Sequence, residues 1–302
     1  METDGVMVLN TEQIAGADGK EHEPAKGIVK AGDYIMAVDH CEITGKKELL
    51  EAVGNLTGTF VVLTVRRNGE TIDLKIKPVE YETGEYRLGI WVRDNVQGLG
   101  TVTFLTDQSR FGALGHGVPG VDTSVLMSIA EGNVYRTSIR DITKGQSGSP
   151  GSMEGMIIYN NYNILGTIDK NTEAGIYGKI DKIDELFTEQ TAIRTAKKEE
   201  IITGPATIRC FVDNEVREFD IEVTQVDMMS QEINKGLVIK VTDEELLEKT
   251  GGIIQGMSGS PIIQNGKLIG AVTHVFVQDS TKGYGIFIEN MLKQVNLPEM
   301  CG

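Results

Sequence analysis

The sequence predicts a fold dominated by β-structure, and three observations carry this prediction. Glycine is abundant, with 36 of 302 residues, well above the usual share of about 7%, which indicates many tight turns. The apolar stretches between these turns are strand-sized, and helical periodicity is thin. Two similar segments lie 111 residues apart, measured from Ser147 to Ser258. This separation fits two β-barrels of about 100 residues each.

Composition excludes several classes of protein. The net charge of −15 disfavours nonspecific binding to nucleic acid and docking on anionic membranes, because both surfaces are negative. Three scattered cysteines predict no disulfide framework, and four single histidines argue against a histidine-rich metal site. No stretch approaches the about 18–20 apolar residues of a membrane span, and no signal peptide or anchor is visible. We therefore expect no metal and no other cofactor.

Residues 1–81 predict a small separate domain. The element candidates, in order, are strands at 6–9 and 35–38, a helix at 46–55, and strands at 60–65 and 71–76. Leucine and valine recur at helical spacing in the helix candidate. Asn68-Gly69 separates the last two strands and is a preferred pair for a type I′ hairpin turn.

A resemblance to a known domain lies within this segment. From Gly27 to Ile35 the sequence is Gly-Ile-Val-Lys-Ala-Gly-Asp-Tyr-Ile, which resembles the glycine–aspartate signature of bacterial PDZ domains. The resemblance implies a β domain with one or two helices, and a peptide segment as partner, added to a sheet edge. The chain begins close to Val6, so we expect the domain to lack its first strand. A PDZ-like spacer that binds no peptide is the alternative.

Residues 82–302 predict two barrels, at about 82–195 and 196–302. Helical periodicity is limited here to short stretches near 182–187, 244–248 and 289–295. The repeated segments are Gly145-Gln-Ser-Gly-Ser-Pro150 and Gly256-Met-Ser-Gly-Ser-Pro261. Each is followed by an apolar strand candidate and a glycine-rich turn, so the repeat indicates duplicated structural units.

The second copy resembles the nucleophile loop of chymotrypsin-like serine peptidases. A serine on such a tight loop is flanked by backbone N–H groups that hold the oxyanion of the tetrahedral intermediate. The N–H groups of Gly256 and Ser258 are the predicted oxyanion hole. The strand that follows supplies the predicted substrate-binding edge, at Thr273, His274 and Val275. An ordinary turn is the alternative for an isolated hexapeptide, and Ser147 in the first copy is the rival nucleophile.

A serine nucleophile needs a base, because a free hydroxyl reacts poorly at neutral pH. His116 lies between glycines and precedes the first repeat, where a two-barrel enzyme places its base. His22 and His40 belong to the PDZ-like segment, and His274 lies in the predicted binding edge. His116 is therefore the candidate base.

The residues alone leave three candidates for the acid that orients this base. Asp243 is the candidate, with Asp122 and Asp141 as rivals nearer to His116. A structural role competes with the catalytic one, because Thr242-x-x-Glu245 has the pattern of a capping box at a helix start. In that case Asp243 would only favour the helix dipole.

The combined pattern resembles a family of bacterial peptidases. The PDZ-like segment, Gly-Ala-Leu-Gly-His116, Thr-Asp243 and the segment from Glu248 to Phe276 are together similar to the stage IV sporulation protein B peptidases. The resemblance implies a chymotrypsin-like double β-barrel and a triad of His116, Asp243 and Ser258. It favours Asp243 over its rivals.

The same resemblance implies a serine endopeptidase of sporulation signalling. Such an enzyme is exported to the space between forespore and mother cell. It cleaves a membrane-associated regulator of an intramembrane protease, and also itself, and so activates the processing of a sigma factor. A catalytically inactive binding or regulatory module on the same fold is the main alternative, and a structural spore protein is a third.

Overall fold

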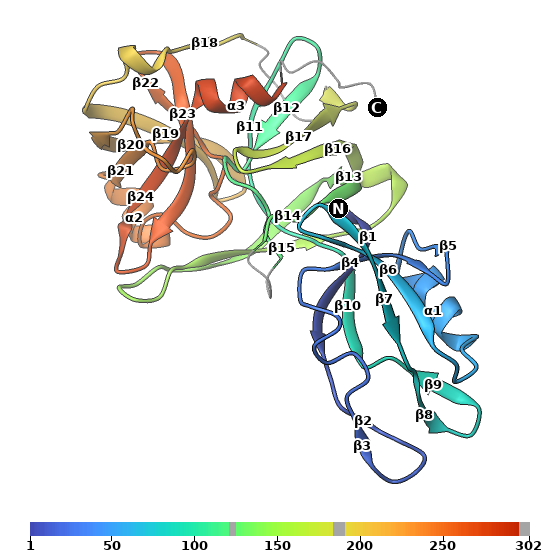
Figure 1. Ribbon diagram of the computed structural model, residues 1–302. Coiled ribbons are helices and arrows are strands. Elements are labelled where there is room, and N and C mark those ends of the chain that lie inside the picture. Colours follow the sequence, from blue (N-terminus) through green and yellow to red (C-terminus); the bar gives the residue numbers. More distant parts are fainter. Residues whose placement is uncertain (121–124, 184–190, 296–302) are drawn as a thin grey trace. The chain divides into compact units, whose positions relative to one another are not determined.

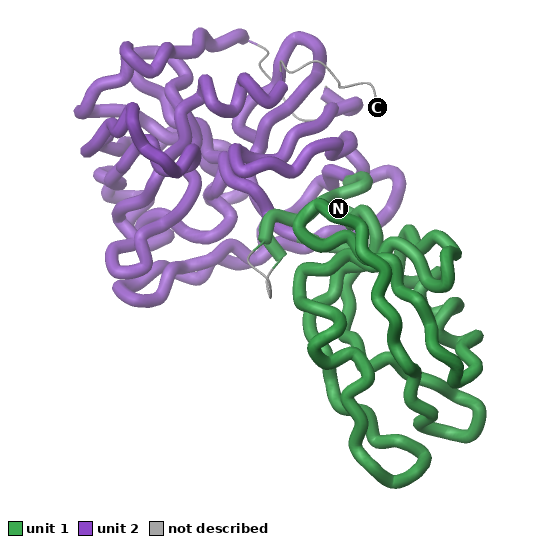
Figure 2. The backbone as a smooth tube through the Cα atoms, viewed as in Figure 1, with its two compact units in different colours: residues 1–97, 119–132 green, residues 98–118, 133–302 purple. Residues whose placement is uncertain are grey.

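The computed structural model describes residues 1–120, 125–183 and 191–295, which divide into two compact units (Figure 2). Unit 1 comprises residues 1–97 and 119–132, and unit 2 comprises residues 98–118 and 133–302. The predicted boundary at residue 81 falls within strand β8 (Val79–Glu82). Unit 1 continues to Gln97, because β10 (Ile90–Asn95) pairs with the first strand of the chain.

Unit 1 is a small sheet with one helix. Its elements are β1 (Glu2–Thr11), β2 (Ile14–Ala15), β3 (Glu21–His22), β4 (Tyr34–Val38), β5 (Cys41–Glu42), α1 (Lys46–Gly54), β6 (Val61–Arg67), β7 (Glu70–Ile76), β8 (Val79–Glu82), β9 (Glu85–Arg87), β10 (Ile90–Asn95) and the start of β13 (Ile129–Tyr135). The strands run in the order β1-β4-β6-β7. The predicted Asn68-Gly69 turn joins β6 to β7, with positive φ at both residues, as a type I′ turn requires.

Strand β1 is paired along both of its edges. On one edge it pairs with β4, at Val6 and Met7, and with β13 at Glu2 and Thr3. On the other edge, β10 runs antiparallel to it from Thr11 to Glu2, with two irregularities in register. The α1 helix also belongs here, since the backbone N–H of Lys46 at its first turn donates to Asp94 Oδ2 of β10 (2.8 Å).

The glycine–aspartate signature of unit 1 has a structural explanation. Asp33 is almost fully buried, with 1% of its surface exposed. Arg67 of β6 donates to both carboxylate oxygens at 2.7 Å, from Nε and from one terminal nitrogen. The backbone N–H of Lys30 also donates to Asp33. A buried charge is stable only with such complete pairing, so the signature aspartate depends on Arg67.

Unit 2 contains the remaining elements. They are β11 (Val102–Leu105), β12 (Arg110–Ala113), the end of β13, β14 (Thr137–Thr143), β15 (Ser152–Ile157), a 3₁₀ turn at Asn161–Asn163, β16 (Ile164–Thr172), β17 (Gly175–Ile180), β18 (Arg194–Thr195), a 3₁₀ turn at Lys198–Glu200, β19 (Gly204–Val212), β20 (Glu215–Val226), β21 (Leu237–Val241), α2 (Glu244–Thr250), β22 (Pro261–Gln264), β23 (Lys267–Phe276), β24 (Asp279–Phe287) and α3 (Ile288–Val295).

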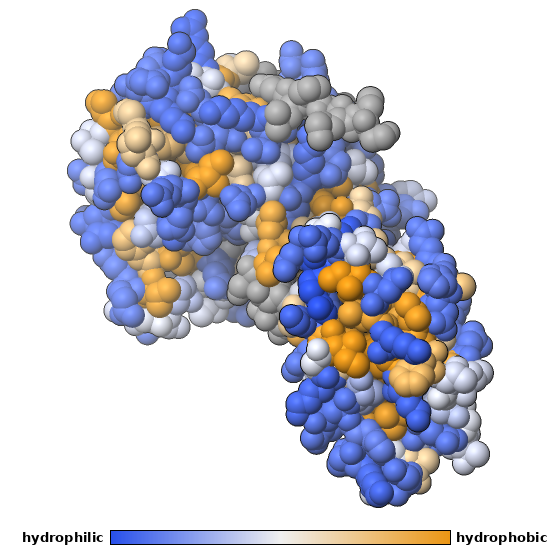
Figure 3. Space-filling view, viewed as in Figure 1, coloured by the Kyte–Doolittle hydropathy of each residue, from blue (hydrophilic) through white to orange (hydrophobic). Residues whose placement is uncertain are grey.

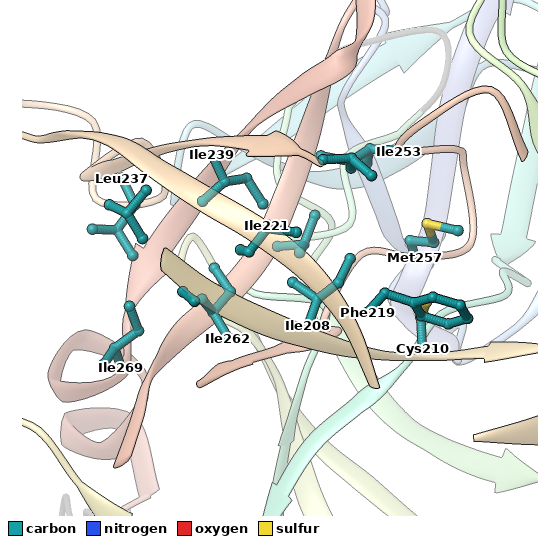
Figure 4. Packing of buried hydrophobic residues seen from close by; sticks show 14 of the residues in the cluster. Ile208, Cys210, Phe219, Ile221, Leu237, Ile239, Ile253, Met257, Ile262 and Ile269 are labelled. Carbon is teal, nitrogen blue, oxygen red and sulfur yellow. The ribbon is translucent and has the colours of Figure 1, made fainter. Parts of the chain in front are cut away.

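The second half of unit 2 is a closed barrel of six strands, β23-β22-β19-β20-β21-β24, in which β24 pairs back to β23 (Figure 1). Alternate residues of β19 and β20 point inward, as period-two burial shows. Its core contains Ile208, Phe219, Ile239 and Ile262 (Figure 4). Before this barrel, β11, β12, β17 and β16 form a sheet, and β14 and β15 pair with each other as a separate hairpin.

The predicted all-β fold class is confirmed, and the second of the two predicted barrels is closed. Two of the three helical stretches appear as α2 and α3, and the third, 182–187, extends outside the described residues. Hydrophilic residues cover most of the face of unit 2 seen in Figure 3. Within the described ranges, no helix combines the length and the apolar character that a membrane crossing needs.

Removal of Arg67 is expected to destabilise unit 1 strongly. In Arg67→Met the buried Asp33 carboxylate keeps only its backbone partner, so the free energy of unfolding should fall by about 3–5 kcal/mol. Trp91 is the only tryptophan and lies in β10, so its fluorescence during urea denaturation reports on unit 1. The double variant Asp33→Leu/Arg67→Met, which removes both charges, should lose clearly less. An equal loss in both variants would contradict this account.

Candidate active site

The loop that carries Ser258 joins α2 to β22 and is held against the second barrel. Met257, the residue before the serine, is buried in the same cluster as Phe219 and Cys210 (Figure 4). Gly256 and Gly259 have φ of +105° and +93°, which side chains rarely adopt. A Cβ on Gly259 would also lie 2.1 Å from the carbonyl oxygen of Thr101. The glycines of the motif are therefore required by the backbone of this loop.

Two carbonyl groups of this loop accept hydrogen bonds from residues at the start of β11, Thr101 and Thr103. The N–H of Thr101 donates to the Ser258 carbonyl at 2.9 Å. The hydroxyl of Thr103 donates to the Gly259 carbonyl at 2.7 Å. Among the described residues, neither the N–H of Gly256 nor the N–H of Ser258 donates to a protein acceptor. The two predicted oxyanion-hole donors are thus both available to a ligand.

The Ser258 hydroxyl lies against the predicted substrate-binding edge. It donates to the carbonyl oxygen of Thr273 in β23 at 2.8 Å. The Thr273 side chain is buried and donates to the Asn234 carbonyl at 2.7 Å, so Thr273 can serve a substrate only through its main chain. The pairing of β23 with β24 shifts register between Val272 and Val275, which sets His274 outside the regular ladder.

His116 follows a sharp turn at the end of β12, where Leu114 and Gly115 both have positive φ. Its neighbour Gly115 packs on β23, because a Cβ at Gly115 would lie 3.0 Å from the Thr273 side chain. The imidazole of His116 lies beside that of His274, with ring centroids 4.7 Å apart. The structure therefore brings Ser258 and His116 to the same segment, Thr273–His274.

The hydrogen bond of His116 determines which ring nitrogen is free. Nδ1 lies 2.9 Å from the carbonyl oxygen of Gly117. A carbonyl only accepts, so Nδ1 carries the hydrogen and Nε2 keeps its lone pair. Nε2 is the nitrogen that can act as a base. In this structure Ser258 donates to Thr273 rather than to His116.

Both imidazoles of the pair have lowered pKa values. Burial lowers the pKa of His116, and the Gly117 carbonyl opposes this in part. Desolvation of the ring, then the charges of His116 and Lys235, lower the pKa of His274 to about 4, although the residue as a whole is exposed. Both rings are thus neutral at pH 7, and a neutral His116 is the form that accepts a proton.

The predicted acid, Asp243, lies at the start of α2. One carboxylate oxygen accepts from the N–H of Leu246 at 2.9 Å, and the other accepts from the N–H of Asp220 at 3.3 Å. Asp243 is therefore the N-cap of α2, one residue later than the predicted capping box at Thr242. Glu245, the other member of that box, instead pairs with Arg217 and Lys249. No hydrogen bond between described residues joins Asp243 to His116.

The alternative candidates for the acid and the nucleophile are bonded elsewhere or lie outside the described residues. Asp141 is exposed on β14 and accepts from the N–H of the next residue, and Asp122 lies outside the described residues. Ser147 is exposed and its hydroxyl donates to the Gln278 carbonyl at 3.0 Å. Over the described ranges, no three His, Cys, Asp or Glu side chains gather as a metal site, and Cys41 and Cys210 are free.

Sequence reasoning missed three residues that support the nucleophile loop: Thr101, Thr103 and Met153. The first two are described above, and the backbone N–H of Met153 donates to the Gln255 carbonyl at 2.8 Å. Each lies more than a hundred residues from its partner and contributes backbone or hydroxyl groups. No local sequence pattern predicts such contacts.

In unit 1, the edge of β1 that faces α1 is covered by the chain itself. Leu88, Ile90 and Val92 pack in the core of this unit with Leu49 of α1. The indole of Trp91 donates to Glu12 at 2.7 Å. A peptide that pairs with this edge of β1 has to displace β10.

Comparison with known proteins gives a family. The model of the SpoIVB peptidase S55 family matches residues 84–292. No curated protein matches the chain.

Solved structures are similar to separate parts of the chain. The PDZ domain of the SdrC-like protein from Listeria innocua is 25% identical, covering 31% of this chain and 98% of that one, with a TM-score of 0.25. The Rv3671c protease of M. tuberculosis, in an inactive form, is 11% identical, covering 48% of this chain and 85% of that one, with a TM-score of 0.30.

The lowered pKa of His116 predicts activity at unusually low pH. The base must be neutral, so the rate at which a fluorophosphonate labels Ser258 should fall only below pH 6.5, the ordinary value for histidine. In His274→Ala, His116 loses the ring that shields it from water, and the acid limb should move to higher pH. His274→Phe keeps a ring there and should resemble the wild type. An acid limb that is the same in all three proteins would contradict this explanation.

Proposed function

Because the chain belongs to the SpoIVB peptidase S55 family, we propose that it is a serine endopeptidase in which Ser258 is the nucleophile and His116 the base. The observation that carries the assignment is the pair of N–H groups at Gly256 and Ser258, on either side of Met257, for which the described residues offer no acceptor. Two such donors beside a serine hydroxyl form the site where a developing oxyanion is stabilised. Each donor of this kind contributes about 10²–10³ in kcat.

The reaction follows from this geometry. The Ser258 hydroxyl exchanges the Thr273 carbonyl for Nε2 of His116, which removes its proton as Oγ attacks the substrate carbonyl. The carbonyl oxygen becomes an oxyanion held by the Gly256 and Ser258 amides. The imidazolium then gives its proton to the leaving amine, and an acyl-enzyme remains on Ser258. Water, deprotonated by His116, releases the acid product and restores the serine.

The substrate is proposed to lie along Thr273–Val275. The register shift between β23 and β24 at this point interrupts the regular pairing of the two strands. Once Ser258 turns toward His116, the Thr273 carbonyl is free to accept from a substrate N–H. An extended peptide can then bind as an additional strand. Any serine endopeptidase needs such main-chain binding, since it must accept varied sequences.

Asp243 is the proposed acid of the triad, and its support is the resemblance of the Thr-Asp243 motif to that of the family. In the structure its carboxylate caps α2. The Gly117 carbonyl holds Nδ1 of His116 in the tautomer that the acid would otherwise select. Replacement of Asp243 therefore tests two roles, which a single variant can separate.

The biological setting rests on the family. We propose a role in sporulation signalling, with a membrane-associated regulatory protein and the enzyme itself as substrates, and export to the space between forespore and mother cell. The PDZ-like unit is proposed to bind a peptide segment of a substrate. One observation favours the alternative of an inactive regulatory module, namely that the Ser258 hydroxyl is bonded to Thr273. Covalent labelling of Ser258 distinguishes the two functions.

Replacement of the nucleophile gives the primary test. Ser258→Ala should abolish fluorophosphonate labelling and reduce peptide hydrolysis by several orders of magnitude. Ser147→Ala is the matched control, since it alters the same position of the first repeat and should keep activity within about twofold. Full labelling and hydrolysis in Ser258→Ala would disprove the assignment. An unlabelled wild type would favour the inactive module.

Asp243→Asn separates catalysis from helix capping. Asparagine caps a helix as well as aspartate does, so the melting temperature should be nearly unchanged. As the triad acid, Asp243 should give a loss of about 10⁴ in kcat in this variant. The measurement is kcat at pH 7 beside a thermal melt. A kcat within twofold of the wild type would leave Asp243 as the cap of α2 alone.

A further inference from the structure

The hairpin β14–β15 carries the first repeat but has no part in the reaction described above. Its two strands pair with each other and with no other strand among the described residues. Figure 1 shows the hairpin, in green, reaching along the second barrel. Partly buried Ile142 and Met153 pack against the core of that barrel. The hairpin therefore contacts the half of unit 2 that contains the nucleophile loop.

Three backbone hydrogen bonds join the hairpin to residues 250–255, just before Ser258. The N–H of Gln255 donates to the Gly151 carbonyl, and the N–H of Met153 donates to the Gln255 carbonyl, both at 2.8 Å. These two bonds form a parallel bridge between Ser152 and Gln255. The N–H of Gly145 donates to the Thr250 carbonyl at 2.8 Å. The hairpin thus binds this segment at both of its ends, Thr250 and Gln255.

The bond to the Gln255 carbonyl determines where the N–H of Gly256 points. These two groups belong to one peptide unit, which is planar and trans. In such a unit the C=O and the following N–H point in opposite directions. While Met153 holds the carbonyl on the hairpin side, the Gly256 N–H is directed away from the hairpin, where no residue in the described part of the chain accepts from it.

Gly256 itself gives this peptide unit little resistance to rotation. Its φ of +105° is open to glycine, which populates both signs of φ with similar ease. The same freedom allows the preceding peptide to flip, and a flipped unit would present a carbonyl oxygen to the oxyanion. An external hydrogen bond is therefore needed to keep the donor in place. The Met153 side chain also restricts this peptide unit, because it lies 3.0–3.2 Å from the position of a Cβ on Gly256.

Two glycines beside the repeats, Gly151 and Gly251, are required by this contact. A Cβ on Gly151 would lie 2.7 Å from the Ile254 side chain and 2.2 Å from the Thr143 carbonyl. A Cβ on Gly251 would lie 2.3 Å from the Gly145 carbonyl. Only glycine lets the backbones of the hairpin and the loop approach this closely.

We propose that the hairpin β14–β15 is a positioning element of the active site, in which the backbone N–H of Met153 holds the Gln255–Gly256 peptide with its N–H in the oxyanion hole. The inference rests on the proposed function, because it concerns the donors of the same site. It assigns the first copy of the repeat to support of the second copy.

Met153→Pro is the direct test, because proline has no backbone N–H; it also replaces the side chain, for which Met153→Ala is the control. The Met153 N–H is bonded to Gln255, so the β14–β15 ladder keeps its own hydrogen bonds. The maximal rate of fluorophosphonate labelling should fall by roughly 10- to 100-fold, less than the about 10²–10³ cost of losing an oxyanion donor outright. The concentration for half-maximal labelling should change little. The pH dependence should be unchanged, because His116 is not altered.

Matched variants separate positioning from a general loss of structure. Met153→Ala keeps the N–H and should lose clearly less than Met153→Pro. Lys144→Pro places a proline in the same hairpin, at an N–H that has no partner among the described residues, and should keep its rate within about threefold. Gly151→Ala, which pushes the hairpin away from Ile254, should lower the rate in the same way as Met153→Pro. All rates are measured at a temperature at which circular dichroism shows each variant folded.

The outcomes distinguish this inference from the proposed function. An unlabelled wild type would disprove the function of Ser258. A labelled wild type, with folded Met153→Pro and Gly151→Ala at the wild-type rate, would overturn the inference alone. Equal losses in Met153→Pro and Lys144→Pro would overturn it as well, since they would show that the hairpin matters only as a fold.

Discussion

The site depends on one constraint: the carbonyl groups around Ser258 must be bound on the far side of the loop so that two amides remain free. Thr101 and Thr103 bind the carbonyls of Ser258 and Gly259, and Met153 binds that of Gln255. Because a peptide unit is planar, the bound Gln255 carbonyl directs the Gly256 N–H the opposite way. The Met257 carbonyl, which shares a peptide unit with the Ser258 N–H, accepts from the N–H of Ser260. The first half of unit 2 thus orients the loop that belongs to the second half.

This constraint explains why both halves of unit 2 contribute to one site. The second barrel supplies the serine, its buried anchor Met257 and the edge at Thr273. The first half supplies His116, and also Thr101, Thr103 and Met153, which bind carbonyl groups of the loop. In the proposed mechanism the second half supplies the nucleophile and the oxyanion donors, and the first half supplies the base and the groups that hold the loop. The glycines at Gly151 and Gly259 allow the backbones to come close enough for these bonds.

The imidazole pair adds a second effect of packing. The His116 and His274 rings lie 4.7 Å apart, and desolvation lowers the pKa of each. His116, the proposed base, is thereby neutral at pH 7. In unit 1, β10 covers the edge of β1 beside α1, so peptide binding there competes with the chain's own strand. In both places, packing within the chain decides which groups can react or bind: it keeps the two imidazoles neutral, and it covers one edge of β1.

The sequence by itself determined what depends on local chemistry. Glycine-rich turns between strand-sized apolar segments predict the strands, Asn68-Gly69 predicts its turn, and the hexapeptide at Gly256 predicts a nucleophile loop. The tertiary structure decided how these parts are connected. That β10 belongs to unit 1, that Asp243 caps α2, and that Met153 and Thr101 bind the nucleophile loop are all consequences of contacts distant in sequence. Backbone groups make most of these contacts, and every residue type carries the same backbone, so no residue pattern reveals them.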